Sequence, residues 1–444
     1  MKRLSSCVVT IGALRIGGDH PVAIQTMTTT PTTDVDATVK QASMLFNAGA
    51  DMVRVAVPDM NSAGSLPRIR EKLLKIGLTG PLVADVHFNP ALAHLAAAHA
   101  DKVRINPGNF GNRKSTLSNL ETLVRICHEH GTAIRVGTNM GSLAKATINT
   151  FGMGPLAMAE ETLKFLAMLE QLCFYNTVVS LKASHTAHTV QACMIMADRM
   201  KQTGRVYPMH IGVTEAGNGL AGRIKSAMGI GTMLKAGIGN TIRVSLTEPP
   251  EHEIPVAKQI LRHLAAEYPN IPQAQNNAIT VVYTSDCPET IAIMAALDLG
   301  DKLLTGQIEK ISIKAPNITD QSTISQITQL LLQAAGKQNL LTEFISCPCC
   351  GRNTIDVQRI LEEVKEYATN IPGLKLAVMG CVVNGPGEMT DARYGILGAG
   401  EGMVWIYKEG FPVKKNIPQG KAAKALKEML EADGALTRPG LGQG

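Results

Sequence analysis

Cysteine residues cluster near the C-terminal end of this chain in a pattern typical of a metal centre. The chain has 444 residues and nine cysteines, three of which stand in the run SCPCCG as Cys347, Cys349 and Cys350. Cys347 and Cys350 have the Cys-x-x-Cys spacing that lets two thiolates reach one metal centre. Cys381 follows in GCVVNGPGE, where a tight bend at NGPG would bring Glu388 back towards the sulfur. The candidate donors are therefore three thiolates and either Cys349 or Glu388.

Two kinds of metal centre suit these donors. A structural zinc site is closed and tetrahedral, but the adjacent Cys349 and Cys350 could not both face one ion without strain, and the second Cys-x-x-Cys of zinc fingers is missing. Three thiolates with a weaker oxygen donor favour an iron–sulfur cluster that keeps one exchangeable corner. A radical enzyme using S-adenosylmethionine is excluded, because its cysteines would lie much earlier in the chain. The cluster is favoured and zinc stays the alternative.

Eight short β-rich runs recur over the first 250 residues, separated by segments with helical spacing of apolar residues. The runs start at Val22, Met52, Leu82, Lys102, Ala133, Val178, Met209 and Thr241. This alternation predicts a parallel sheet, and eight units predict one closed (β/α)8 TIM barrel. A doubly wound open sheet is less favoured, because no glycine-rich dinucleotide fingerprint follows the first strand.

Five cations lie inside these strands between apolar neighbours. They are Arg54, Arg104, Arg135, Lys182 and Arg243. The strand period of two turns them into the barrel, where an unpaired cation costs several kcal/mol. The acids at strand ends are Asp85 and Glu215, which leaves a surplus of about three positive charges, and such a surplus suits a diphosphate. In the alternative interpretation, these cations pair with acids on neighbouring loops.

Further polar side chains stand at strand ends or just beyond them, the rim where barrel active sites form. They include His87, Asn139, Ser184, His210 and Ser245. His87 and His210 are equally consistent with hydrogen-bonded framework residues. The rim is therefore the predicted substrate site.

The rest of the chain divides into two smaller parts. After Ala265 the stretch EYPNIPQAQNN reads as a linker, and the strand and helix patterns that follow predict an inserted α/β spacer unit over 266–343. Residues 344–444 form a predicted α+β domain with its cysteines at turns, after a barrel domain over 1–265. The predicted architecture is thus a TIM barrel, an inserted unit and a C-terminal α+β iron–sulfur domain.

Bulk properties exclude several classes of function. There is no secretory signal and no run of about 18 apolar residues that could span a bilayer, so we expect a cytoplasmic protein without a membrane partner. The net charge is +6 and only 4% of residues are aromatic, with no basic tract interleaved with aromatics. We therefore expect no nucleic-acid partner.

The order of motifs resembles one enzyme family. The motifs are ADMVRVAVP, LVADVHF, KVRINPGNFGNR, SLKAS, HIGVTEAG, GIGNTIRVSL, CPCCGR and GCVVNGPGE. They resemble the 4-hydroxy-3-methylbut-2-enyl diphosphate synthases of the methylerythritol phosphate route to isoprenoids, and the likeness covers residues 5–260 and 344–410. The resemblance implies an oxidoreductase.

The resemblance also implies roles for individual residues. Cys347, Cys350 and Cys381 would bind a four-iron four-sulfur (4Fe-4S) cluster with Glu388 as fourth ligand, and Cys349 would be a bystander. The positions that surround the diphosphate in the family match Arg54, Arg104, Arg135, Lys182, Arg243 and Ser245. The positions near the reacting end of the substrate match Asp85, His87, Asn139 and Glu215. Glu215 is the predicted proton donor, and Glu388 would move aside for the substrate oxygen.

The implied reaction is reductive ring opening of 2-C-methyl-D-erythritol 2,4-cyclodiphosphate, with two electrons from a reduced flavodoxin or ferredoxin. The alternative is a barrel lyase or transferase acting on a phosphorylated substrate, with structural zinc in its terminal domain. The inserted unit departs from the short bacterial form, in which a cluster domain closes over the partner's barrel in a homodimer. Whether this chain closes on its own barrel or on a partner's stays open at this point.

Overall fold

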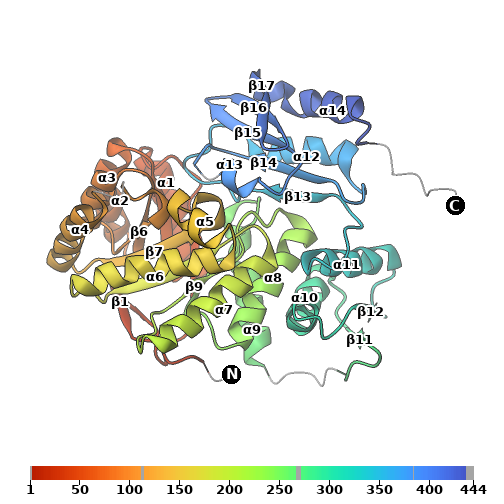
Figure 1. The fold of residues 1–444 in the computed structure, drawn as a ribbon, viewed down its shortest axis with the longest axis horizontal. Coiled ribbons are helices and arrows are strands. Elements are labelled where there is room, and N and C mark those ends of the chain that lie inside the picture. Colours follow the sequence, from red (N-terminus) through yellow and green to blue (C-terminus); the bar gives the residue numbers. More distant parts are fainter. Residues whose placement is uncertain (1–2, 112–114, 267–271, 384, 437–444) are drawn as a thin grey trace.

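The structure is a computed structural model that describes residues 3–111, 115–266, 272–383 and 385–436 (Figure 1). The barrel lies at the lower left of this view, the inserted unit at the lower right, and the cysteine-bearing domain above both. Residues 112 and 113 of the KVRINPGNFGNR motif, residues 267–271 of the predicted linker and residue 384 of NGPGE lie outside the described residues.

Eight parallel strands form the barrel. They are β3 (Ala23–Met27), β4 (Met52–Val57), β5 (Leu82–Val86), β6 (Lys102–Ile105), β7 (Ala133–Asn139), β8 (Thr177–Lys182), β9 (His210–Ile211) and β10 (Thr241–Ile242). Their order in the sheet is β8-β7-β6-β5-β4-β3-β10-β9, and a parallel bridge between Val179 and Met209 joins the two ends. The predicted TIM barrel is confirmed.

Helices follow the strands and surround them. They are α1 (Val35–Ala48), α2 (Met60–Lys75), α3 (Pro90–Ala97), α4 (Thr116–His130), α5 (Lys145–Phe151), α6 (Pro155–Gln171), α7 (Thr186–Gln202), α8 (Gly219–Lys235) and α9 (Glu253–Ala265). Short 3-10 helices stand at η1 (Pro107–Asn109), η2 (Met140–Ser142) and η3 (Pro250–His252). Asp34 accepts a hydrogen bond from the Ala37 N–H at the start of α1, and Gly49 ends that helix in the left-handed conformation.

Strand period decides which side chains enter the barrel. Val53 and Val55 are fully buried in the large apolar core between strands and helices, so Arg54 between them points inward. At the opposite end from the strand C-termini, a hairpin of β1 (Val9–Ile11) and β2 (Leu14–Ile16) packs against the first inward layer of the barrel. The sequence did not lead us to expect this hairpin. It places apolar side chains beneath the barrel and leaves the polar side chains for the C-terminal rim.

The inserted unit is a small β-α-β-α layer packed on the barrel. Its strands β11 (Ala278–Val282) and β12 (Lys310–Lys314) pair in parallel, and its helices are α10 (Pro288–Leu304) and α11 (Gln321–Ala334). Helix α10 contacts α8 and α9 of the barrel. The described residues contain no helix long and apolar enough to cross a membrane.

The third part is a five-stranded sheet with helices on one face. Its strands, in spatial order, are β13 (Glu343–Ser346), β14 (Lys375–Met379), β15 (Tyr394–Gly400), β16 (Met403–Lys408) and β17 (Phe411–Pro418). Helices α12 (Val357–Ala368) and α14 (Ala422–Ala432) share an apolar core with one face of this sheet. A single turn, α13 (Gly385–Glu388), follows β14. The first two strands end just before Cys347 and Cys381, so both cysteine turns lie at the same edge of the sheet.

One buried carboxylate ties the inserted unit to the barrel. Asp298 of α10 accepts hydrogen bonds from the Tyr283 hydroxyl at 3.0 Å and from Nε2 of His263 in α9 at 2.7 Å. We expect Asp298→Ala to lower the free energy of unfolding by about 2 kcal/mol, because the buried Tyr283 hydroxyl loses its acceptor and the contact with His263 is lost. Asp301 lies on the same helix as Asp298, and Asp301→Ala, which removes a partly exposed ion pair with Lys235 of α8, should change it far less. Thermal unfolding of both variants measures the two effects. Equal losses of stability in the two variants would contradict the role of Asp298 in joining the inserted unit to the barrel.

Candidate active site between the barrel and the cysteine domain

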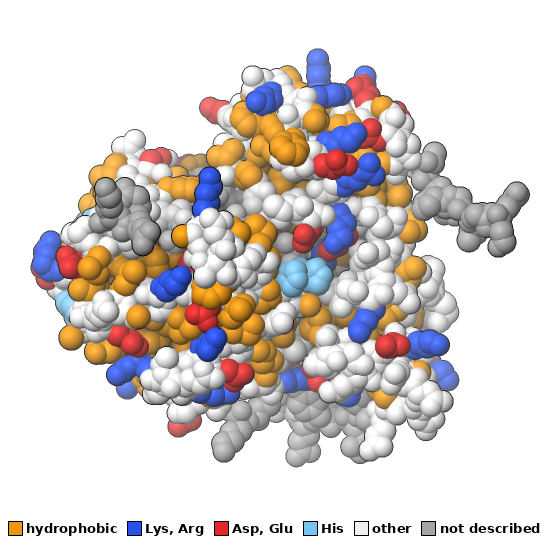
Figure 2. Space-filling view, viewed as in Figure 1, with side chains coloured by type: hydrophobic (Ala, Val, Ile, Leu, Met, Phe, Trp, Pro, Cys, Tyr) orange, Lys and Arg blue, Asp and Glu red, His pale blue; other side chains and the backbone are white. Residues whose placement is uncertain are grey.

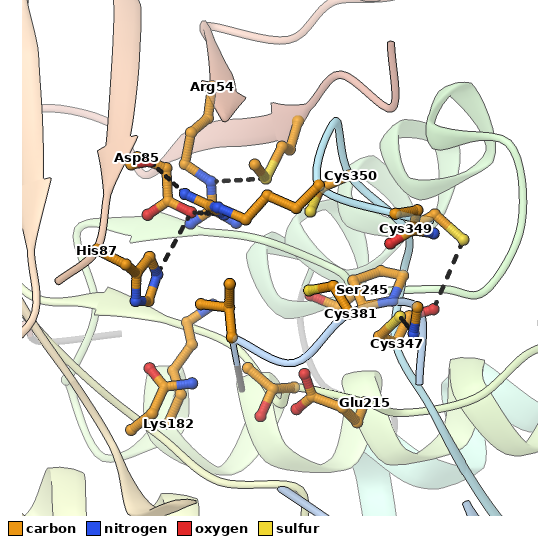
Figure 3. A pocket seen from close by; sticks show the side chains of 18 of the residues that line it. Arg54, Asp85, His87, Lys182, Glu215, Ser245, Cys347, Cys349, Cys350 and Cys381 are labelled. Carbon is orange, nitrogen blue, oxygen red and sulfur yellow. Dashed lines mark hydrogen bonds and ion pairs between the residues drawn. The ribbon is translucent and has the colours of Figure 1, made fainter. Parts of the chain in front are cut away.

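A cavity lies where the C-terminal ends of the barrel strands face the cysteine domain (Figure 3). From the barrel it is lined by Arg54, Asp85, His87, Arg104, Arg135, Asn139, Lys182, Glu215, Arg243 and Ser245, among others. From the cysteine domain it is lined by Cys347, Cys349, Cys350, Arg352, Met379 and Cys381, among others. In the close view the four thiols gather on one side and Arg54, Asp85 and His87 on the other. The cavity is thus shared by both domains of one chain.

Polar contacts between the two domains hold this arrangement closed. Arg352 donates to Oδ2 of Asp85 at 2.8 Å, and Nδ2 of Asn139 donates to Oε1 of Glu388 at 2.9 Å. At the C-terminal end of β13, the hydroxyl oxygens of Thr247 and Ser346 lie 2.6 Å apart. Each contact joins a barrel residue to a residue of the same chain's third domain. The cysteine domain therefore closes over its own barrel.

The loop that carries Glu215 runs directly alongside β13. Glu215 has a left-handed backbone with φ of 50°, which a non-glycine residue adopts only at some cost. The next residue, Ala216, forms a parallel bridge with Ser346, the residue before the first cysteine. The strained turn and this bridge therefore fix the position of Glu215 relative to the cysteine turn.

Three cations in the cavity have no acidic partner within ion-pair distance among the described residues: Arg54, Arg135 and Lys182. The Nε of Arg54 meets only the sulfur of Met27, at 3.0 Å, and two guanidinium nitrogens of Arg135 make no hydrogen bond. Burial lowers the pKa of Arg54 to about 10 and the pKa of Lys182 well below its ordinary value. These groups are thus prepared for an anion that would restore their charge balance.

Asp85 is a carboxylate that offsets part of the positive charge of the neighbouring arginines in the cavity. Burial acts to raise its pKa, but Arg352, Arg54 and Arg104 together hold the pKa well below the usual range. Nη1 of Arg104 lies 3.3 Å from Oδ1 of Asp85 and also contacts the ring of His87. Burial and the neighbouring Arg104 lower the pKa of His87 well below its ordinary value. The His87 ring is therefore neutral and does not add to the positive charge.

Arg243 pairs with an acid on a neighbouring element, which was the alternative interpretation of the strand cations. Its Nε and Nη2 donate to the two oxygens of Glu253, at 3.2 and 3.1 Å, and both side chains are buried. Glu253 begins helix α9, ten residues after the strand position of Arg243. One of the five predicted cations is therefore neutralised by an acid on a neighbouring element.

Glu215 and Glu388 form a buried pair of carboxyl groups. Burial raises the pKa of Glu215 above its ordinary value, although hydrogen bonds with Thr214 and Glu388 partly offset this effect. Burial and the nearby Glu215 raise the pKa of Glu388 well above its ordinary value. Two adjacent buried carboxyls cannot both ionise easily, so the pair holds a proton at the edge of the cavity.

The thiols face a common space from two turns. Cys349 has a left-handed φ of 59°, which lets the CPCC turn place Cys347 and Cys350 on the cavity lining together with Cys381. Burial, with Cys350 and Cys347 nearby, raises the pKa of Cys381 to about 12. Three neighbouring, half-buried thiolates would need positive charge, which iron would supply, so the thiol set fits an iron–sulfur group. Glu388 does not fit in the same way, since it does not line the cavity and its carboxyl accepts a hydrogen bond from Asn139, which does.

As they lie, the described side chains do not converge on one metal-ion position. No group of three or more His, Cys, Asp and Glu residues in the described part of the chain is arranged to hold a single metal ion.

Most of the predicted site residues line this cavity, and three do not: Glu388, Ser184 and His210. Ser184 is half-buried beyond the end of β8, and His210 is buried deeper in the barrel, where Nδ1 contacts the Thr241 hydroxyl. His210 thus has the environment of a framework residue. Sequence reasoning missed Arg352 and Glu253. Arg352 stands only two residues after Cys350, within CPCCGR, and that position was the available signal.

The fold and the site together define a class of protein. A TIM barrel carries a cationic rim suited to an anion, and a second domain brings half-buried thiols suited to iron over that rim, as in an iron–sulfur oxidoreductase. Family models agree: the GcpE TIM-barrel domain matches residues 6–258 and the GcpE protein C-terminal domain matches residues 343–432. The chain therefore belongs to the GcpE family, a family of iron–sulfur enzymes.

Curated relatives carry one enzyme name. A 4-hydroxy-3-methylbut-2-en-1-yl diphosphate synthase (ferredoxin) from Gloeothece citriformis is 36% identical, over 97% of this chain and 93% of its own. One from Prochlorococcus marinus is 34% identical, over 99% and 95%. A 4-hydroxy-3-methylbut-2-en-1-yl diphosphate synthase (flavodoxin) from Bacteroides fragilis is 30% identical, over 97% and 96%. These names confirm the family resemblance and the oxidoreductase class, and they do not favour the zinc alternative.

Two glycines allow the domains to close. The backbones of Gly141 in η2 and Gly387 in α13 lie so close that a Cβ on Gly387 would stand 1.9 Å from the Gly141 carbonyl oxygen. We expect Gly387→Ala to hold the cysteine domain away from the rim, because both opposing groups are backbone. The radius of gyration from small-angle scattering should rise, and turnover should fall by about 10²-fold. Gly420→Ala is the matched control, since a Cβ there meets nothing within 4 Å. Unchanged scattering and turnover in Gly387→Ala would refute the closure role.

Proposed function

We propose that this chain converts 2-C-methyl-D-erythritol 2,4-cyclodiphosphate into 4-hydroxy-3-methylbut-2-enyl diphosphate by reductive ring opening and loss of one hydroxyl group. One observation carries the proposal: three buried cations with no acid within ion-pair distance and three half-buried thiols line the same cavity. The first set suits a diphosphate and the second suits an electron-carrying metal group. The names of the relatives supply the reaction that joins the two.

The bonds and electrons of this conversion balance simply. The bond from C2 to the phosphate oxygen breaks, and the oxygen keeps the electron pair as part of the free diphosphate. The C3 hydroxyl leaves with its bonding pair and takes up one proton to become water. Two electrons supplied from outside then complete the double bond between C2 and C3. The site must therefore hold a diphosphate, deliver two electrons and provide one proton.

The rim of the barrel would hold the diphosphate. Arg54, Arg135 and Lys182 offer positive charge from three strands, and Arg can bind a phosphate through paired donors. An anion placed among them offsets the cost of their burial. The contacts of Arg352 and Glu388 with the barrel exclude water above the bound substrate, which strengthens these charge interactions.

Cys347, Cys350 and Cys381 would hold a 4Fe-4S cluster, with Glu388 as the donor to the remaining iron. When bound, this group would supply the electrons singly, after receiving them from a reduced flavodoxin or ferredoxin. In this structure the Glu388 carboxyl instead accepts a hydrogen bond from Asn139. A role of Glu388 as a ligand would therefore require that its carboxyl leave Asn139.

Glu215 would give the proton to the departing hydroxyl. Its carboxyl lines the cavity, and burial raises its pKa, so it keeps a proton at a higher pH than an exposed glutamate does. The neighbouring Glu388 is positioned to share that proton.

Anaerobic purification tests the proposal. We expect a brown protein with about four irons and four sulfides per chain, which turns over the cyclic diphosphate when dithionite is supplied. A colourless protein with stoichiometric zinc, or a brown one without this turnover, would refute the function.

Cysteine variants test the ligand set. Cys347→Ser, Cys350→Ser and Cys381→Ser should each lose the visible absorbance and most of the iron, because each removes a thiolate from the cluster. Cys349→Ser should keep both, as should Cys287→Ser, an exposed control in the inserted unit. If Cys349→Ser also bleaches the protein, Cys349 is a ligand and the proposed set is wrong.

The pH profile tests Glu215. The reaction needs its protonated form, so kcat should be full at low pH and fall as pH rises through the raised pKa of this carboxyl. Glu215→Gln should lower kcat by about 10²–10⁴-fold with little change in KM, and it should remove that fall. Exposed Glu401→Gln is the control. A Glu215→Gln enzyme that loses affinity but keeps kcat would exclude the role of proton donor.

A further inference from the structure

The outer edge of the cysteine domain combines exposed apolar side chains with lysines. Strand β17 is the last strand of its sheet and pairs only with β16 among the described strands. Phe411 is 73% exposed and Val413 is 51% exposed, although edge strands usually avoid exposed apolar residues. Lys415 on the same strand, Lys421 and Lys424 just after it are exposed as well. We call β17 with these two following lysines the β17 edge.

This edge carries a local surplus of positive charge. Residues 403–424 contain five lysines and one acid, Glu409, which pairs with Arg393. Within the described chain, no acidic side chain lies within ion-pair distance of Lys415, Lys421 or Lys424, whereas the other two lysines have acidic partners. Figure 2 shows several Lys and Arg side chains, with some Asp and Glu among them, at the top of the molecule, where Figure 1 places β17 and α14.

The same edge is linked to the cavity through the sheet. Trp405 of β16 is the only tryptophan of the chain. The Lys415 ammonium lies 5.0 Å from the centre of the Trp405 ring, and the indole N–H of Trp405 donates to the side-chain oxygen of Asn416. In the sheet register Trp405 stands opposite Leu397, which stands opposite Met379. Met379 lines the cavity two residues before Cys381.

The row from Trp405 through Leu397 to Met379 spans a short distance through apolar side chains. Two strand spacings separate the Trp405 and Met379 backbones, roughly 10 Å. Trp405 and Cys347 both pack against the small apolar cluster that contains Met379 and Leu397. A carrier at the β17 edge would thus stand close enough to the thiols for electrons to pass through packed protein.

We propose that the β17 edge is the docking surface for the protein that delivers electrons, a small acidic one-electron carrier. This inference rests on the proposed function, because only a redox reaction needs such a partner. The apolar side chains would supply the contact and the lysines the attraction, as charge complementarity does for transient partners. The wide groove beside Cys349 is a poorer candidate, because its lining includes Glu251 and Asp356 and only one lysine, Lys40.

Charge reversal at the edge tests the docking site. The test variant combines Lys415→Glu, Lys421→Glu and Lys424→Glu in the full iron-loaded chain. The control variant combines Lys310→Glu, Lys314→Glu and Lys337→Glu, three exposed lysines of the inserted unit, and changes the net charge equally. The edge variant should raise KM for reduced flavodoxin or ferredoxin by about tenfold and weaken the salt dependence of the rate. Turnover driven by dithionite should be unchanged in both variants.

The outcomes separate the two hypotheses. No turnover of the cyclic diphosphate with dithionite in the unaltered enzyme would refute the proposed function. Normal dithionite turnover, with the same carrier KM in the edge variant, would refute the docking site and leave the lysines as protection of a sheet edge. Equal effects in edge and control variants would also refute it, since net charge alone would explain them.

Carrier binding can also be followed without turnover, by surface plasmon resonance on the oxidised proteins. The edge variant should bind about tenfold more weakly than the control. If edge reversal instead abolishes binding to anionic vesicles, or changes the oligomeric state in size-exclusion chromatography, and spares the carrier, the surface serves a membrane or a second copy and the proposal fails.

Discussion

The structure depends on the burial of positive charge that the protein itself does not neutralise. Arg54, Arg135 and Lys182 stand inside the rim of the barrel with no acid of the described residues within ion-pair distance, and burial disfavours their charged forms. Such a site is costly in the free protein and becomes favourable when an anion arrives. The rest of the architecture can be understood as what keeps these cations in place: eight strands that aim them, an apolar hairpin beneath them and a second domain above.

Closure and chemistry use the same side chains. Asp85 offsets the charge of Arg104 and also binds Arg352 of the cysteine domain. Asn139 accepts a hydrogen bond from Arg104 and donates one to Glu388. The hydrogen bonds and ion pairs that hold the two domains together therefore involve side chains that also face the cavity.

Several parts of the fold followed directly from residue patterns. Alternating strand and helix periods predicted the barrel, and the period of two within strands predicted that Arg54 and Arg135 face inward. The spacing of Cys347 and Cys350 with the later Cys381 predicted that three thiols share one site, and they line one cavity. The β1–β2 hairpin and the edge strand β17 were not expected, because three-residue runs and a Pro- and Lys-rich run carry weak strand signals.

By itself, the sequence determined which chemical groups this protein has and which way most of them point, since side-chain type and strand period are local properties. Only the tertiary structure decided how the charges pair. Arg243 is neutralised by Glu253, and Asp85 binds Arg352 from 267 residues away. Glu388 accepts a hydrogen bond from Asn139 and does not line the cavity with the thiols. The tertiary structure also decided that the cysteine domain covers the barrel of its own chain. These outcomes depend on distances between residues far apart in sequence, and such distances exist only once the domains have packed.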